Sequence, residues 1–90
     1  MTGWRFRVTE VANSDLDKIS EPIKTRILEK LKWFRDNFEK LVPETLGDRW
    51  RGFFKLRVGD WRIAYTIEFT KKLITIRFID RRDKIYKRKI

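Results

Sequence analysis

The feature that most constrains this sequence is a pair of short stretches in which polar and apolar residues alternate on either side of Gly59-Asp60. Alternation with a period of two is typical of β-strands that bury one face. Glycine reaches the positive φ that a two-residue type II′ turn requires at its first central position. The pattern therefore predicts a β-hairpin of strands 53–58 and 61–69, in which Val58 lies opposite Trp61 and Arg57 lies opposite Arg62.

This register sorts the side chains of the hairpin onto two faces. A slip of one residue would exchange the faces, so the register is strongly specified. The basic face carries Lys55, Arg57 and Arg62. The other face is apolar and is predicted to pack against the core; its residues are Phe54, Leu56, Val58, Trp61, Ile63, Tyr65 and Ile67.

A third strand over residues 73–80 extends this predicted hairpin into a meander. If Lys71-Lys72 is also a two-residue connection, Thr66 lies opposite Arg77 and Arg62 lies opposite Arg81. Ile67 then faces Ile76 and Tyr65 faces Phe78, so the third strand contributes to both faces.

The predicted register collects like charges in one row of the sheet. Like charges directly opposite each other destabilise a sheet by a few tenths to about 1 kcal/mol per pair. A local violation of this kind is typical of a functional site. We therefore predict a phosphate-binding cluster; the alternative is that these side chains extend into water or pair with Glu68, Asp80 or Asp83. The cluster comprises Lys55, Arg57, Arg62 and Arg81.

The residues before the hairpin predict one strand and two helices. Residues 4–9 alternate like a strand, and Ser14 is placed to cap a short helix that ends near Ser20. Ser20-Glu21-Pro22 is a second helix start, with proline inside the first turn where its missing N–H does no harm. An apolar stripe at helical spacing then predicts a long helix packed on the core. Its residues are Ile23, Ile27, Leu28, Leu31, Phe34 and Phe38.

The periodicity stops over residues 39–52, where Pro43, Gly47 and Gly52 indicate a loop. Trp50 in this loop is expected to anchor it on the core, with stacking on RNA as the alternative. Trp4 is expected in the core, and Trp33 at the edge of the helix stripe, against the core or a partner protein.

The order of these elements predicts an α+β fold in one domain over residues 1–90. An N-terminal strand and two helices precede an antiparallel three-strand meander and a short basic C-terminal segment, with the helices on one face of the sheet. The other face is predicted to be open, and its basic residues make it the place to look for function.

Composition narrows the chemistry that this face can perform. The chain has 23 Lys and Arg against 13 Asp and Glu, a net charge of +10, which favours a polyanionic partner such as nucleic acid. It has no cysteine and no histidine, which excludes thiolate chemistry, disulfides and histidine-based zinc sites. We predict no metal and no cofactor. Without a secretory signal or a membrane-spanning apolar run, the protein is expected to be cytoplasmic, with no membrane partner.

The run Phe53-Phe54-Lys55-Leu56-Arg57-Val58-Gly59-Asp60-Trp61-Arg62-Ile63-Ala64-Tyr65 resembles a segment of the RelE/ParE superfamily of toxins from type II toxin–antitoxin systems. The stretch Arg81-Arg82-Asp83-Lys84-Ile85-Tyr86 resembles the basic pair and tyrosine near the family's C-terminus. The resemblance implies a RelE-like endoribonuclease that cuts mRNA on the ribosome. It also implies a cognate antitoxin that inhibits the toxin and carries any binding to operator DNA.

The resemblance also implies roles for individual residues. Lys55 and Arg57 match basic positions of the family, Arg62 matches an arginine that stabilises the transition state, and Tyr86 matches the C-terminal tyrosine. The last basic position falls on Arg81 or Arg82, and the predicted register favours Arg81. Additional RNA contacts are expected from Arg77, Arg82, Lys84, Lys87 and Arg88.

The implied reaction uses the 2′-hydroxyl of the RNA as nucleophile, leaving a 2′,3′-cyclic phosphate and a 5′-hydroxyl. Neighbouring cations lower the pKa of lysine and tyrosine, so Lys55 or Tyr86 is a candidate proton acceptor and Arg81 a candidate donor. Arg57 and Arg62 are better suited to bind the charged transition state. Tyr86 has the alternative of stacking on a base.

Two other functions share these features. A resemblance to the ParE-like members of the superfamily would imply a gyrase inhibitor, although these members generally lack the full set of basic and tyrosine positions. A non-catalytic RNA- or ribosome-binding module would also use a cationic face. The run from Lys87 to Ile90 is expected to be a solvated tail or a ribosomal RNA contact, which an acidic antitoxin segment would cover together with Tyr86.

Overall fold

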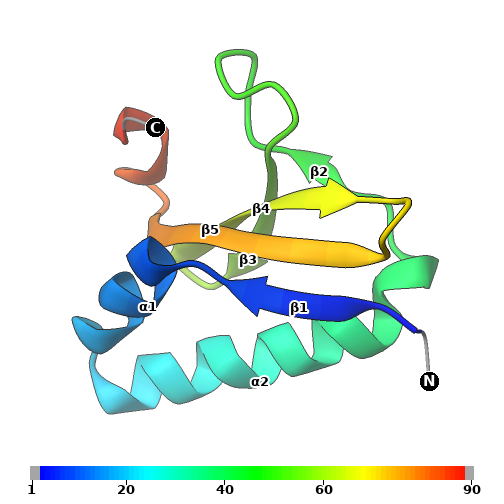
Figure 1. The fold of residues 1–90 in the computed structure, drawn as a ribbon. Helices are drawn as coiled ribbons and strands as arrows, with labels where there is room; N and C mark the ends of the chain where they lie inside the picture. The colour runs from blue at the N-terminus through cyan, green and yellow to red at the C-terminus, as the bar shows by residue number, and fades with distance from the viewer. Residues whose placement is uncertain (1–2, 89–90) are drawn as a thin grey trace.

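The computed structural model describes residues 3–88 and shows a mixed five-stranded sheet with helices on one side (Figure 1). The strands lie in the order β1-β5-β4-β3-β2. The elements along the chain are β1 (Arg5–Val8), α1 (Glu10–Asp17), α2 (Glu21–Asn37), the 3₁₀ turn η1 (Phe38–Lys40), β2 (Glu44–Thr45), β3 (Phe54–Val58), β4 (Trp61–Glu68), β5 (Leu73–Arg81) and the 3₁₀ turn η2 (Ile85–Lys87).

This architecture confirms the predicted α+β class and the predicted order of strand, two helices and meander. One detail differs, because β1 pairs with β5 in parallel and the sheet is therefore not entirely antiparallel. The two helices form the crossover between β1 and the rest of the sheet, and a parallel partner needs a crossover of this length.

The long helix begins as predicted and the short one does not. Ser20 is the N-cap of α2 and a proline lies in its first turn. The cap of α1 is Thr9, whose hydroxyl accepts a hydrogen bond from the Ala12 backbone N–H at 3.2 Å. The prediction that Ser14 caps this helix is wrong, because Thr9 starts the helix earlier and Ser14 lies inside it.

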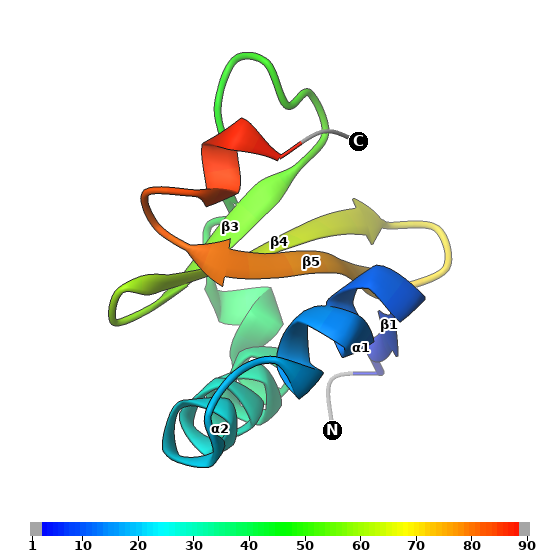
Figure 2. The same ribbon diagram turned by 90° about the vertical axis from the view of Figure 1, so that its left-hand side faces the viewer.

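The β3–β4 hairpin has the predicted register, with Val58 opposite Trp61 and Arg57 opposite Arg62. Gly59 has a φ of +57°, the positive value for which glycine was expected at this turn. The predicted apolar face of the hairpin packs against the helices, and Figure 2 shows α2 running along that side of the sheet. Phe34 of α2 and Tyr65 of β4 meet there with ring centroids 4.9 Å apart.

The predicted register between β4 and β5 is wrong. The connection is the loop of residues 69–72, in which the non-glycine Lys72 has a φ of +49°. Ile67 therefore pairs with Ile74, and a β-bulge leaves Arg77 without a partner between Ile76 and Phe78. As a result Arg62 faces Asp80, Trp61 faces Arg81, and the predicted row of three arginines does not form.

The bulge at Arg77 gives β5 a role in two separate cores. Before the bulge Ile74 and Ile76 point to the helices, and after it Ile79 does so, while Phe78 is turned to the opposite face. On that face Phe78 joins a second, smaller core that also contains Leu46, Trp50, Ala64 and Ile85.

The second core corrects the prediction of an open sheet face. The loop of residues 46–53 and the C-terminal turn lie on the side of the sheet opposite α2 (Figures 1 and 2). Trp50 is buried in this core, which confirms that it anchors the loop. Trp4 is partly buried against Phe38, whereas Trp33 lies exposed on α2 with Lys30 over its ring.

Within residues 3–88, no helix is long and apolar enough to cross a membrane.

The packing of α2 gives a direct test of the main core. Ile27 is fully buried, whereas the adjacent Leu28 is 47% exposed. We expect Ile27→Ala to lower the free energy of unfolding by about 2–5 kcal/mol, since it opens a cavity. Leu28→Ala, the control, should change it by about 0.5 kcal/mol or little more. Urea denaturation measures both values, and equal losses would contradict this placement of the helix.

Candidate active site

Two of the predicted site residues meet on the face of the sheet opposite the helices. The Lys55 Nζ on β3 donates a hydrogen bond of 2.7 Å to the hydroxyl oxygen of Tyr86 in η2. The same Nζ lies 5.3 Å from the centroid of the Tyr86 ring. The Lys55 side chain is only 14% exposed, so its ammonium group is held in place rather than free in solvent.

A third member of the site, Glu44, was missed by the sequence analysis. The short strand β2 pairs with β3 and places Glu44 directly opposite Lys55. Both carboxylate oxygens of Glu44 accept hydrogen bonds from Arg57, with Nε to Oε1 at 3.0 Å, and Lys55 Nζ lies 3.9 Å from Oε2. We call these four residues the basic site: Glu44, Lys55, Arg57 and Tyr86.

The charges of the basic site perturb one another. The hydrogen bonds from Arg57 lower the pKa of Glu44 against a smaller opposing effect of burial, and the charges of Arg57, Lys55 and Arg62 lower it further. The hydrogen bond to Glu44 in turn raises the pKa of Arg57. Glu44 is therefore ionised at neutral pH and offsets part of the positive charge of the site.

Arg62 lies next to the basic site without joining its hydrogen bonds. It is opposite Arg57 in the hairpin, and its Nη1 donates to the backbone carbonyls of Gly59 at 2.8 Å and Trp61 at 2.9 Å. These bonds fold the side chain back over the turn. Arg62 is close enough for its charge to lower the pKa of Glu44.

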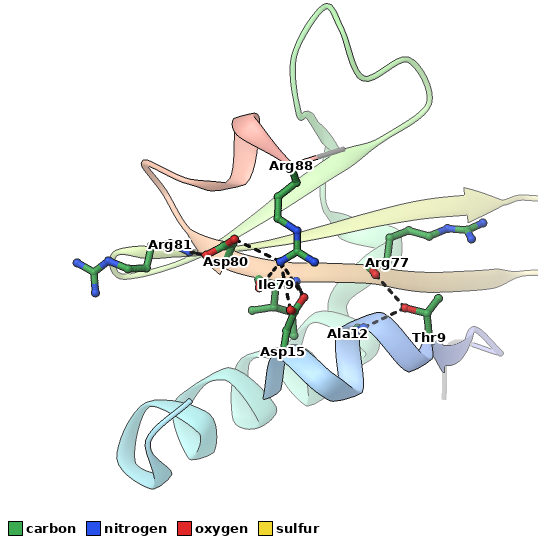
Figure 3. A network of polar contacts seen from close by, with 8 residues as sticks. All are labelled: Thr9, Ala12, Asp15, Arg77, Ile79, Asp80, Arg81 and Arg88. Atoms are coloured by element: carbon green, nitrogen blue, oxygen red, sulfur yellow. Dashed lines mark hydrogen bonds and ion pairs between the residues drawn. The ribbon is translucent and has the colours of Figure 1, made fainter. Parts of the chain in front are cut away.

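The structure separates Arg81 from this group. Its register partner is Trp61, and its guanidinium carbon lies 5.8 Å from the centroid of that ring. Figure 3 shows the side chain pointing away from the C-terminal turn. The register that favoured Arg81 over Arg82 is therefore wrong. Arg82 lies near the β3–β4 turn, where its backbone N–H donates to the Asp60 carbonyl at 2.8 Å.

The residues predicted to make additional RNA contacts fall into two groups. Lys84 and Lys87 are both exposed near Tyr86, and the Arg77 Nε donates to the Thr66 hydroxyl oxygen at 3.0 Å on β4. Arg88 instead turns inward to two carboxylates (Figure 3). Its guanidinium is sheltered between these carboxylates, unlike the exposed side chains of Lys84 and Lys87.

A groove of about 230 Å³ adjoins the basic site between α2 and β3. Glu44, Lys55 and Arg57 line its polar end, while Leu41 and the exposed Val42 contribute to its apolar wall. The basic site therefore borders a groove that is polar at one end and apolar along one wall.

The basic site combines groups that can bind an anion with groups that can transfer a proton. Arg57 offers a guanidinium suited to bidentate contacts with a phosphate, and Glu44 occupies that position in the structure. Lys55 and Tyr86 both carry exchangeable protons, and the Lys55 Nζ lies 2.7 Å from the Tyr86 hydroxyl oxygen. Across residues 3–88 no three His, Cys, Asp or Glu side chains come together in a way that could hold a metal.

These observations define the class of protein: a small α+β domain that carries a cationic site on its sheet. The sequence profile of the ParE toxins of type II toxin–antitoxin systems matches residues 6–86. The chain therefore belongs to this family, within the RelE/ParE superfamily of toxins. Among curated protein sequences, none matches it significantly.

Solved structures of superfamily members share the fold. The toxin–antitoxin complex RelBE2 of Mycobacterium tuberculosis contains a chain 25% identical, with a TM-score of 0.76, covering 88% of this chain and 98% of that one. A chain of the RelE–RelB complex of the archaeon Pyrococcus horikoshii is 20% identical, with a TM-score of 0.66 and coverages of 91% and 97%. A chain of the ParDE system of P. aeruginosa is 18% identical, with a TM-score of 0.70 and coverages of 90% and 98%.

The ion pair at the centre of the basic site makes a titration prediction. We expect the Glu44 carboxyl to titrate below pH 4.5, its ordinary value, because Arg57 stabilises the ionised form. Stability contributed by this pair is then complete above that value and is lost as the pH falls through the lowered pKa. Carbon-13 NMR of the side-chain carboxyls measures the midpoint.

Two variants complete this measurement. Arg57→Gln should return the midpoint of Glu44 toward 4.5, whereas Lys18→Gln, which removes an equal charge from an exposed position at the end of α1, should leave it low. A midpoint that does not respond to Arg57→Gln would show that the two side chains are not paired in solution.

Proposed function

We propose that this toxin is an endoribonuclease that cleaves mRNA associated with the ribosome and thereby stops translation and growth. The observation that carries the proposal is the 2.7 Å hydrogen bond between Lys55 and Tyr86, with Arg57 and Glu44 beside them. Two groups able to transfer protons stand next to a guanidinium able to bind phosphate. Metal-independent RNA cleavage requires proton transfer and stabilisation of the charged phosphorane, and these residues can supply both.

In the proposed reaction the ribose 2′-oxygen attacks the adjacent phosphorus, and the bond from phosphorus to the 5′-oxygen breaks. The 2′-hydroxyl loses a proton to a base and the leaving 5′-oxygen gains one from an acid. The products are a 2′,3′-cyclic phosphate and a 5′-hydroxyl. The nucleophile comes from the RNA, so the protein supplies proton transfer and charge stabilisation.

The geometry supports a division of these roles. Arg57 binds the phosphate, whose oxygens replace the carboxylate oxygens of Glu44, and stabilises the added negative charge of the transition state. Lys55 donates a hydrogen bond to Tyr86, and the two remain the predicted candidates for proton transfer. Glu44 is ionised at neutral pH, but its lowered pKa makes it a weak base, so we assign it to orienting Arg57 and not to proton transfer.

The proposed partners are mRNA, the ribosome and a cognate antitoxin. Several similar structures are complexes of a toxin with its antitoxin, including those from M. tuberculosis, P. horikoshii and Methanococcus jannaschii. An acidic antitoxin segment over the basic site would neutralise the positive charge and exclude RNA in one step. Any contact with operator DNA is assigned to the antitoxin.

Inhibition of gyrase is the second candidate function. The matching family profile describes ParE toxins, and a chain of a ParDE system shares the fold. The fold alone does not separate the two activities, because one fold can support several functions. The convergence of Lys55, Arg57 and Tyr86 favours RNA cleavage, since inhibition of gyrase by binding requires no proton transfer.

Removal of one hydroxyl group tests the proposal. We expect induced expression of the wild-type chain in a bacterium to give mRNA fragments with 5′-hydroxyl ends, mapped by primer extension. Tyr86→Phe should slow cleavage by about 10²-fold, in the range for loss of an acid–base group. Asp36→Asn, an exposed substitution on α2, serves as the control and should cleave normally.

The other functions give different outcomes in the same experiment. Growth arrest with intact mRNA and blocked DNA replication would replace this proposal by inhibition of gyrase. Binding to ribosomes without any cleavage by the wild-type chain would indicate a non-catalytic binding module.

A further inference from the structure

The C-terminal turn that carries Tyr86 is attached to the body of the protein by Arg88 (Figure 3). The Arg88 Nη1 lies 3.1 Å from each carboxylate oxygen of Asp15 on α1 and 3.3 Å from Asp80 Oδ2 on β5. It also lies 3.4 Å from the Ile79 carbonyl oxygen, and the guanidinium carbon is 5.0 Å from the Phe78 ring centroid.

This ion-pair cluster is more sheltered than the other ion pairs of the described residues. The side chains of Arg88 and Asp80 are each 23% exposed and that of Asp15 is 13% exposed. Burial alone would lower the pKa of Arg88, but the hydrogen bonds and charges of the two carboxylates outweigh it and raise that pKa. Removal of one member of a sheltered ion pair leaves charge unpaired and is costly.

The acceptor side of the cluster is itself fixed. Asp15 Oδ2 accepts a hydrogen bond of 2.9 Å from the Ile79 backbone N–H, which joins α1 to β5. Arg88 therefore binds to a frame that two secondary-structure elements hold rigid.

Tyr86 lies between two anchors of η2. On one side the fully buried Ile85 inserts into the second core, and on the other Arg88 binds Asp15 and Asp80. A single turn of 3₁₀ helix held by one anchor can pivot about it, whereas two anchors fix the direction of the side chain between them. That direction brings the Tyr86 hydroxyl to Lys55.

We propose that Arg88 is a positioning residue for Tyr86, and that its pairing with Asp15 and Asp80 holds the tyrosine hydroxyl at Lys55 for RNA cleavage. The role in cleavage rests on the function proposed above, whereas the placement of Tyr86 does not. Arg88 acts without touching the substrate, through the turn that it anchors.

The two tyrosines of the chain allow the placement to be measured directly. Tyr65 is buried and Tyr86 is at the site, so a chain labelled with 3-fluorotyrosine has one fluorine reporter in the core and one at the site. In Arg88→Gln we expect the Tyr86 signal to move toward that of free fluorotyrosine while the Tyr65 signal stays. Arg88→Lys keeps the charge and should keep most of the wild-type signal.

Charge and folding are controlled separately. Lys32→Gln removes the same charge from an exposed position on α2 and should leave both signals unchanged. If Arg88→Gln unfolds the chain, the Tyr65 signal moves as well. The variant Asp80→Asn is then used in place of Arg88→Gln, because it weakens the pairing of Arg88 while Asp15 remains. In that variant too we expect the Tyr86 signal to move alone.

Kinetics of the unlabelled chain test the consequence for cleavage. We expect Arg88→Gln to lower kcat by about tenfold or more with little change in KM, because it affects a group used in the chemical step. In the Tyr86→Phe background the same substitution should lower kcat no further, since residues that act through one group are not additive.

Two results would overturn the proposal: an unmoved Tyr86 signal in both Arg88→Gln and Asp80→Asn, or a loss of kcat that adds fully to that of Tyr86→Phe. A wild-type chain that cleaves no RNA would overturn the proposed function instead. The fluorine comparison would still decide whether Arg88 places Tyr86.

Discussion

The β-bulge at Arg77 is the constraint on which the rest of the structure depends. Without it, the alternation of β5 would place Phe78 among the helices and remove it from the second core. The bulged residue is tied down, because the Arg77 carbonyl accepts a hydrogen bond of 2.8 Å from the Thr9 hydroxyl, which also caps α1. One threonine side chain thus joins the start of a helix to the irregularity that lets a single strand serve both faces.

The second core determines where the site lies. Ile85 packs beside Phe78 and Trp50, and this contact brings η2 over the outer face of β3. Tyr86 is the next residue in the chain, so its position at Lys55 follows from hydrophobic packing on one side and from the Arg88 ion pairs on the other. The polar chemistry of the site depends on apolar residues that the substrate never meets.

Sequence reasoning succeeded where local chemistry decides the conformation. Gly59 specified its turn and hence the β3–β4 register, and the apolar stripe specified α2, because both depend on residues close together in the chain. It failed for β5, because Lys72 adopts a positive φ without being glycine and because a bulge leaves no mark in the alternation of residue types. The erroneous row of arginines followed from these two changes of register.

The same difference between local and long-range information explains which residues of the site were predicted and which were missed. Lys55, Arg57 and Tyr86 were predicted from the hairpin and from the family resemblance, and the structure places them together. Glu44 was missed because a strand of two residues shows no periodicity; an isolated carboxylate before a basic strand was the only clue. Arg88 was expected to bind RNA because it lies in a basic run near the end of the sequence, which is typical of a solvated or RNA-binding segment. Only the fold reveals the two carboxylates that pair with it.

The parallel pairing of β1 with β5 has a consequence for how the chain is made. β5 lies between β1 and β4, yet it follows the other four strands of residues 3–88 in the chain. As the polypeptide leaves the ribosome, its first strand has no partner and the helices lack Ile74, Ile76 and Ile79 to pack against. Contacts between strands that are far apart in the sequence form slowly, because the entropy of closing the long loop between them is lost first. A nascent copy of this chain therefore completes its sheet only after β5 has left the ribosome.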